Sequence, residues 1–120
     1  MRVFVFSIFF IIVNYNLSYS ATFKNFTELN KKNVDWRKEY KVSSVKNQAQ
    51  CGGCWAFSSV GAVESAWAIK HNTLYNLSEQ ELIDCSSENH GCEGGSMELA
   101  FQYIIDNGLC SNISYPYNSI

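Results

Sequence analysis

Apolar side chains recur with the period of an α-helix in the segment that starts at Cys54. The stripe consists of Ala56, Val60, Val63 and Trp67, spaced by four, three and four residues. Residues at these spacings lie on one side of a helix. The pattern therefore predicts a helix from Cys54 to about His71, with Ser59 and Glu64 on its other faces.

Two shorter helices are predicted downstream from their N-terminal caps. Ser78 with Glu81 three residues later has the form of a capping box, so a short helix should follow it. Ser96 is expected to cap another helix, which ends at Gly108 in the left-handed way usual for glycine. The apolar side of that last helix comprises Met97, Ala100, Phe101 and Ile104. Residues 86–95, which contain three glycines and no apolar period, are expected to form a loop.

The N-terminal residues have the organisation of a secretory signal peptide. A basic Arg2 precedes the apolar run of residues 3–13, and small polar residues lead to a cleavage position before Ala21. We therefore expect residues 1–20 to be a signal peptide. The alternative, a stable membrane anchor, is weaker because the apolar run is too short to span a bilayer.

The rest of the chain divides into a polar lead-in and one domain. Residues 21–32 are expected to be a linker or a remnant of a pro-segment, and residues 33–120 one partial domain. The net charge of −2 and the lack of a long basic cluster give no support to nucleic-acid binding. Five cysteines behind a signal peptide indicate an oxidising compartment of the secretory pathway, either extracellular or lysosome- or vacuole-like.

Cys54 is the strongest candidate for chemistry. It stands directly before the predicted long helix and after the turn-forming pair Gly52-Gly53. The free N–H groups and the positive end of a helix favour a thiolate over a thiol, and the thiolate is the nucleophile. We therefore interpret Cys54 as a nucleophilic cysteine.

Two plainer uses of the cysteines remain open. Cys51 and Cys54 have the C-x-x-C spacing of a thioredoxin-type redox pair, but the βαβ context of that motif is not visible. A zinc site could use the same pair with Cys85 and Cys92, although six residues separate the second pair, unlike a common zinc spacing. We favour neither, and expect no metal and no cofactor.

Five motifs occur in the order and near the spacing of one enzyme family. They are Val34-Asp35-Trp36-Arg37, Val45-Lys46-Asn47-Gln48, Cys51-Gly52-Gly53-Cys54-Trp55-Ala56-Phe57-Ser58, Leu77-Ser78-Glu79-Gln80-Glu81-Leu82-Ile83-Asp84-Cys85 and Gly91-Cys92-Glu93-Gly94-Gly95, followed by Tyr115-Pro116-Tyr117. Over residues 33–120 the chain resembles the N-terminal half of a papain-like cysteine protease of the cathepsin type. Residues 58–65 and 108–110 further resemble the falcipain and vivapain subgroup of malaria parasites. The resemblance implies an α+β papain-like fold, of which this chain is only the mainly helical left lobe.

The resemblance also implies a role for individual residues. Cys54 corresponds to the nucleophile, and Gln48, with the Cys54 backbone N–H, to the oxyanion hole. The Gly94-Gly95 strip corresponds to the backbone that binds an extended peptide, beside Trp55. Ser96 and Met97 correspond to part of the pocket for an apolar second residue of the substrate. By the same resemblance a disulfide joins Cys51 to Cys92 and leaves Cys54 outside it, while Cys85 and Cys110 lack their family partners.

The family's catalytic His and Asn lie about 130–150 residues beyond the cysteine, farther than Ile120. His71 falls roughly 25 Å from Cys54 along the predicted helix, and His90 lies in a polar loop. We interpret the chain as a truncated cysteine endopeptidase that acts through the Cys54 thiolate on protein or peptide substrates and pairs with a C-terminal lobe. As printed it is expected to be inactive. The alternative is a non-catalytic remnant or binding lobe.

Overall fold

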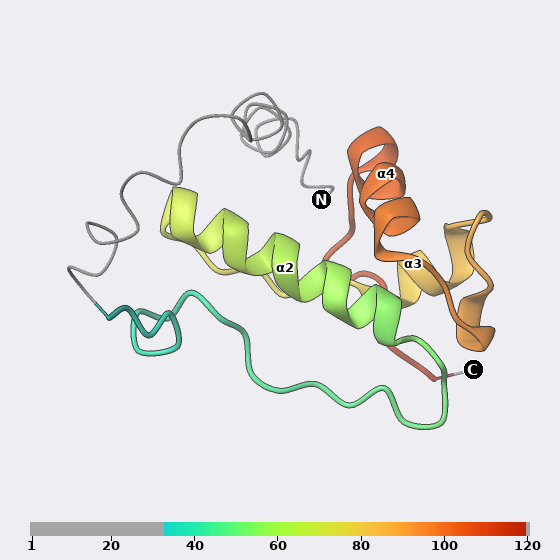
Figure 1. Ribbon diagram of the computed structural model, residues 1–120, viewed down its shortest axis with the longest axis horizontal. Coiled ribbons are helices and arrows are strands. Elements are labelled where there is room, and N and C mark those ends of the chain that lie inside the picture. The colour runs from blue at the N-terminus through green and yellow to red at the C-terminus, as the bar shows by residue number, and fades with distance from the viewer. Residues whose placement is uncertain (1–32, 120) are drawn as a thin grey trace, which may run out of the picture.

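The computed structural model describes residues 33–119, and helices joined by long connecting segments make up this range (Figure 1). Their order is α2 (Cys54–His71), α3 (Glu79–Cys85), the 3-10 helix η3 (Gly91–Glu93) and α4 (Met97–Asn107). An isolated antiparallel bridge between Leu77 and Ser111 brings together the segments before α3 and after α4. None of the helices within the described range is long and apolar enough to cross a membrane. The predicted signal peptide and linker lie outside this range.

Helix α2 is the central element and packs against both α3 and α4. Its bounds confirm the prediction from the apolar stripe, and Val60 and Val63 are buried as expected. Ser59 and Glu64, which were predicted to lie outside the apolar stripe, are fully buried as well, so α2 is enclosed on more than its apolar side. Ser59 donates its hydroxyl to the Trp55 carbonyl at 2.8 Å, so its burial leaves no polar group unpaired.

The buried Glu64 carboxylate forms an ion pair with a lysine and accepts hydrogen bonds from two further donors. Lys46 Nζ lies 2.8 Å from Glu64 Oε1 and 2.5 Å from Glu79 Oε1. Glu64 also accepts from the Ser43 hydroxyl at 2.7 Å and from the Leu77 N–H at 2.8 Å. These bonds attach the irregular segment before α2 to α2 and α3.

The helix caps predicted at Ser78 and Ser96 are present, but the capping box predicted at the start of α3 is incomplete. The Ser78 hydroxyl accepts from the N–H of Glu81 at 3.0 Å, and Ser96 caps α4 in a similar way. The Glu81 side chain does not complete the capping box. It accepts from the N–H of Cys110 at 2.6 Å instead and so ties α3 to the segment beyond α4.

The apolar core lies between the three α-helices. Its fully buried members outside α2 include Leu82, Ala100, Ile104 and Leu109. The disulfide between Cys51 and Cys92 joins the turn before α2 to η3, across 41 positions of sequence, and confirms the expected pairing. The described part of the chain is therefore a mainly helical lobe, as predicted.

Candidate active site

Cys54 is the first residue of α2, and its side chain is an exposed thiol outside the disulfide. The helix ladder begins with the N–H groups of Ala56 and Phe57, which both donate to the Gly53 carbonyl. The N–H of Cys54 therefore precedes the ladder, at the positive end of the helix dipole. The first turn of α2 contains no acidic residue that would oppose a thiolate there.

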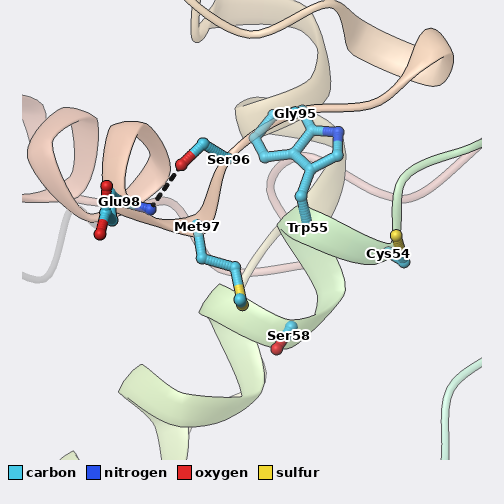
Figure 2. A pocket seen from close by; sticks show the side chains of 7 residues that line it. All are labelled: Cys54, Trp55, Ser58, Gly95, Ser96, Met97 and Glu98. Carbon is cyan, nitrogen blue, oxygen red and sulfur yellow. Dashed lines mark hydrogen bonds between the residues drawn. The ribbon is translucent and has the colours of Figure 1, made fainter.

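A pocket of about 610 Å³ opens beside Cys54, between the start of α2 and the segment that leads into α4 (Figure 2). Its lining residues are Cys54, Trp55, Ser58, Gly95, Ser96, Met97 and Glu98. Five of these were singled out from the sequence. The structure thus brings Cys54 and Trp55 together with Gly95, Ser96 and Met97, which lie some forty positions further along the chain.

Gly95 packs so closely against the Trp55 indole that no side chain fits at this position. A Cβ at Gly95 would lie 2.4 Å from Asn89 Oδ1 and 2.8 Å from Trp55 Cδ2. The indole is 2% exposed and donates its N–H to the Gly91 carbonyl at 3.0 Å. The neighbouring Gly94 has φ of 120°, in a region that side-chain-bearing residues rarely adopt, and does not line the pocket.

Met97 forms an apolar wall of the pocket and is 48% exposed. Its side chain points from the start of α4 towards Ser58 on α2, while the Ser96 hydroxyl turns to accept the N–H of Glu98 (Figure 2). Met97 was expected on the apolar side of α4, but the buried residues of that helix are Ala100 and Ile104. An exposed methionine at a pocket offers adaptable apolar contact to a ligand.

Gln48 lies in the turn that precedes α2, outside the residues that line the pocket. Its amide Nε2 donates to the Cys51 carbonyl at 2.9 Å. A side-chain amide carries two N–H bonds, so this contact uses one and orients the other. The backbone carbonyl of Gln48 accepts from the N–H of Cys51 at 3.3 Å and from the Tyr117 hydroxyl at 2.6 Å.

Neither histidine of the chain lines the Cys54 pocket. His71 lies in the last turn of α2, where its ring stacks on Trp67 with centroids 4.1 Å apart. His90 is exposed beside η3, and its backbone N–H donates to the Gly94 carbonyl at 3.0 Å. Among the described residues, the pocket therefore contains no imidazole.

The disulfide argues against both alternative uses of the cysteines. Cys51 is bonded to Cys92, so it is not the redox partner of Cys54 in this structure. The same bond occupies two of the four sulfurs that a zinc site would need.

Sequence reasoning missed three residues at or beside the pocket. Ser58 follows Cys54 by four positions, and that spacing on a helix could have placed both on one face. Glu98 lines the pocket from the first turn of α4. Asn89 is buried, and its side-chain Oδ1 accepts from the Ser96 N–H at 2.6 Å. No local sequence pattern indicated this contact.

Comparisons with known proteins agree with this geometry. Residues 30–120 match the profile of a family described as "Papain family cysteine protease". Cysteine proteinase 5 of Dictyostelium discoideum is 53% identical over 97 residues, which are 80% of this chain and 28% of the relative. Falcipain-3 of Plasmodium falciparum (isolate 3D7) is 48% identical over 112 residues, 89% of this chain and 23% of the relative.

A solved structure gives the same result for the fold. The Carica candamarcensis cysteine protease CMS1MS2, in complex with E-64, aligns with a TM-score of 0.71 and 45% identity, over 72% of this chain and 41% of that chain. The chain spans about a quarter of the length of the curated relatives above. It belongs to the papain family of cysteine proteases.

Proposed function

We propose that this chain is the nucleophile-bearing lobe of a papain-type endopeptidase, which hydrolyses peptide bonds through the thiolate of Cys54. The observation that carries the proposal is an exposed thiol at the first residue of α2, on a pocket with an apolar wall. The positive end of a helix favours the thiolate that would attack a substrate carbonyl. Family membership supports the same reaction.

In this proposal the N–H of Cys54 and the amide of Gln48 stabilise the oxyanion that forms on the attacked carbonyl. Donors of this kind contribute roughly 3–4 kcal/mol to the transition state. The second N–H of Gln48 is available for this role, because the bond to Cys51 uses only one.

The substrates proposed are proteins or peptides bound in an extended form. The Gly94-Gly95 strip would pair with the substrate backbone, because Gly95 lines the pocket of Cys54 and a glycine permits close approach of another chain. Met97 and Ser96 would contribute one side of a pocket for an apolar, leucine-like residue, second from the scissile bond on its N-terminal side.

Hydrolysis also needs a general base, which takes the thiol proton and returns it to the leaving amine. The described residues offer no imidazole at the pocket. We therefore propose that a further lobe supplies the catalytic His and Asn, and that the 120 printed residues alone do not turn over peptides. The same lack of an imidazole supports the alternative, a non-catalytic lobe that binds extended peptides at the Gly94-Gly95 strip.

We further propose that the protein enters the secretory pathway, with residues 1–20 as its signal peptide and residues 21–32 as a linker or remnant pro-segment. The disulfide between Cys51 and Cys92 supports an oxidising compartment. The destination would be extracellular or a lysosome- or vacuole-like organelle.

The test is turnover of a fluorogenic leucine-containing peptide by the protein at its full natural length. Cys54→Ala should abolish turnover, whereas Ser87→Ala, which removes one exposed polar atom away from the pocket, should leave turnover unchanged. Peptide binding without turnover would favour the non-catalytic alternative. Turnover by the 120 printed residues alone would contradict the proposed need for a further lobe.

A further inference from the structure

The hydroxyl of Tyr117 is bonded to the backbone of the residue that carries the proposed oxyanion donor. Its oxygen lies 2.6 Å from the Gln48 carbonyl, although 69 positions separate the two residues. Burial, followed by the charge of Glu79, raises the pKa of Tyr117, so its hydroxyl stays protonated and remains a donor. The bond thus joins the C-terminal segment to the turn before α2, and the two segments lie side by side in Figure 1.

The Tyr117 ring also contacts the helix that carries Cys54. Phe57, in the first turn of α2, meets it edge to face with centroids 4.9 Å apart at 85°. Edge-to-face aromatic pairs add about 0.5–1.5 kcal/mol beyond their buried area. One side chain therefore bridges the Gln48 turn and the start of α2, the two places from which the proposed oxyanion donors come.

The turn at Gln48 needs such support. Ala49 has φ of 50°, a left-handed conformation that is costly for a residue with a side chain. Its N–H donates to the Asn47 side chain at 2.9 Å, an exposed contact. The Tyr117 hydroxyl and the N–H of Cys51 both donate to the Gln48 carbonyl and restrain the turn from its other side.

Tyr117 is itself held firmly in place by its neighbours on α3. The Ser78 hydroxyl donates to the Tyr115 carbonyl at 2.7 Å, and the Asn118 N–H donates to Gln80 Oε1 at 3.1 Å. The Tyr115 hydroxyl donates to Asp84 at 2.8 Å. The segment on both sides of Tyr117 is therefore anchored to a helix, which gives the Tyr117 hydroxyl a defined position.

From these contacts we infer that Tyr117 is a positioning residue for the oxyanion hole: its hydroxyl and ring hold the Gln48 turn in register with the start of α2. The inference rests on the proposed peptidase function. Loss of the hydroxyl should let the Gln48 amide move relative to Cys54, and this weakens only steps in which an oxyanion or its analogue forms.

The experiment compares Tyr117→Phe, which keeps the ring, with the matched control Tyr75→Phe, in the protein at its full natural length. Tyr75 is also partly buried, but it packs on Trp67, away from the Gln48 turn. Two measurements depend on the oxyanion hole: kcat/KM for a leucine-containing peptide, and Kd for a leucine-containing peptide aldehyde. The aldehyde adds the Cys54 sulfur to its carbonyl carbon, and the carbonyl oxygen takes the thiol proton. The third measurement is alkylation of Cys54 by iodoacetamide, in which sulfur displaces iodide and no oxyanion forms.

We expect Tyr117→Phe to weaken both oxyanion-dependent measurements about fivefold to tenfold and to leave alkylation unchanged. Tyr75→Phe should alter none of the three. In a Gln48→Ala background, Tyr117→Phe should have no further effect, because the residue acts through Gln48. A full effect in that background, or no effect in the wild type, would overturn the inference and leave the proposed function standing.

Two other outcomes are equally decisive. If Tyr117→Phe slows alkylation and also weakens peptide turnover and aldehyde binding, Tyr117 supports the whole lobe rather than the Gln48 turn, and the inference is wrong. If the wild-type protein neither turns over peptide nor forms the aldehyde adduct, the proposed function fails, and the inference fails with it.

Discussion

Replacing Lys46 with methionine should destabilise the protein strongly, because two buried carboxylates depend on its charge. Glu64 and Glu79 are 0% and 1% exposed at their side chains, and the ammonium group lies within 2.8 Å of both. Removing one partner of a buried ion pair costs about 3–5 kcal/mol, since the remaining charge loses its compensation. Glu64 keeps its bonds from Ser43 and Leu77, which favours the lower end of this range.

Equilibrium unfolding in urea measures the effect, with tryptophan fluorescence as the signal, to which the buried Trp55 contributes. A loss of 3 kcal/mol or more moves the midpoint by at least about 1 M, given slopes of about 1–3 kcal/mol per molar urea. The matched control is Lys38→Met, the same change at an exposed lysine, which should leave the midpoint unchanged. Adding Glu79→Gln to Lys46→Met removes one uncompensated charge and should recover part of the loss.

The dependence of stability on pH provides a second test of the Lys46 prediction. Burial lowers the pKa of Lys46, but its hydrogen bonds to Glu64 and Glu79 outweigh burial and raise the pKa above 10.5. A pKa raised on folding means that the stabilisation is complete below pH 10.5 and is lost as the pH rises through the folded value. The wild-type advantage over Lys46→Met should therefore shrink above pH 10.5. Equal midpoints for Lys46→Met and Lys38→Met, or a Glu79→Gln effect that adds to the loss, would refute the electrostatic explanation.

Three further predictions concern single positions. The hydrogen bond to Asp84, with burial, raises the pKa of Tyr115 from 10.0 to about 12, so the stabilisation of the protein by this bond should disappear between pH 10 and about 12. An ultraviolet titration of Tyr115→Phe should lack the tyrosine ionisation near pH 12, and an unchanged titration would contradict the assignment. Gly95→Ala should destabilise the protein by about 1–3 kcal/mol, because its Cβ would lie 2.8 Å from the Trp55 indole. Gly61→Ala, with nothing within 4 Å in the middle of α2, should stabilise it by up to about 1 kcal/mol, and thermal melts that shift the same way for both would contradict the packing argument.

Much of the fold was predictable because helix signals are local. The apolar stripe predicted the bounds of α2, and the hydroxyls of Ser78 and Ser96 marked the starts of α3 and α4. Each of these signals joins residues three or four positions apart, so it can be recognised without knowledge of the surrounding structure. The position of Cys54 at a helix start followed from the same local patterns.

The candidate site was predictable only in part. Resemblance to a family indicated Cys54, Gly95 and Met97, and the structure gathers them around one pocket. Ser58 could have been added from its spacing, whereas the bond from Ser96 to Asn89 joins two loop positions without any periodic pattern.

The sequence by itself determined where the helices begin and end and which cysteine stands at a helix start. Only the tertiary structure decided which polar groups are buried and what they contact. The sequence placed Glu64 outside the apolar stripe of α2, whereas the structure buries it beside Lys46, 18 positions away. Tyr117 reaches the Gln48 turn across 69 positions. Such pairs form because packing encloses polar groups that must then find partners, and the choice of partner depends on the whole fold rather than on neighbouring residues.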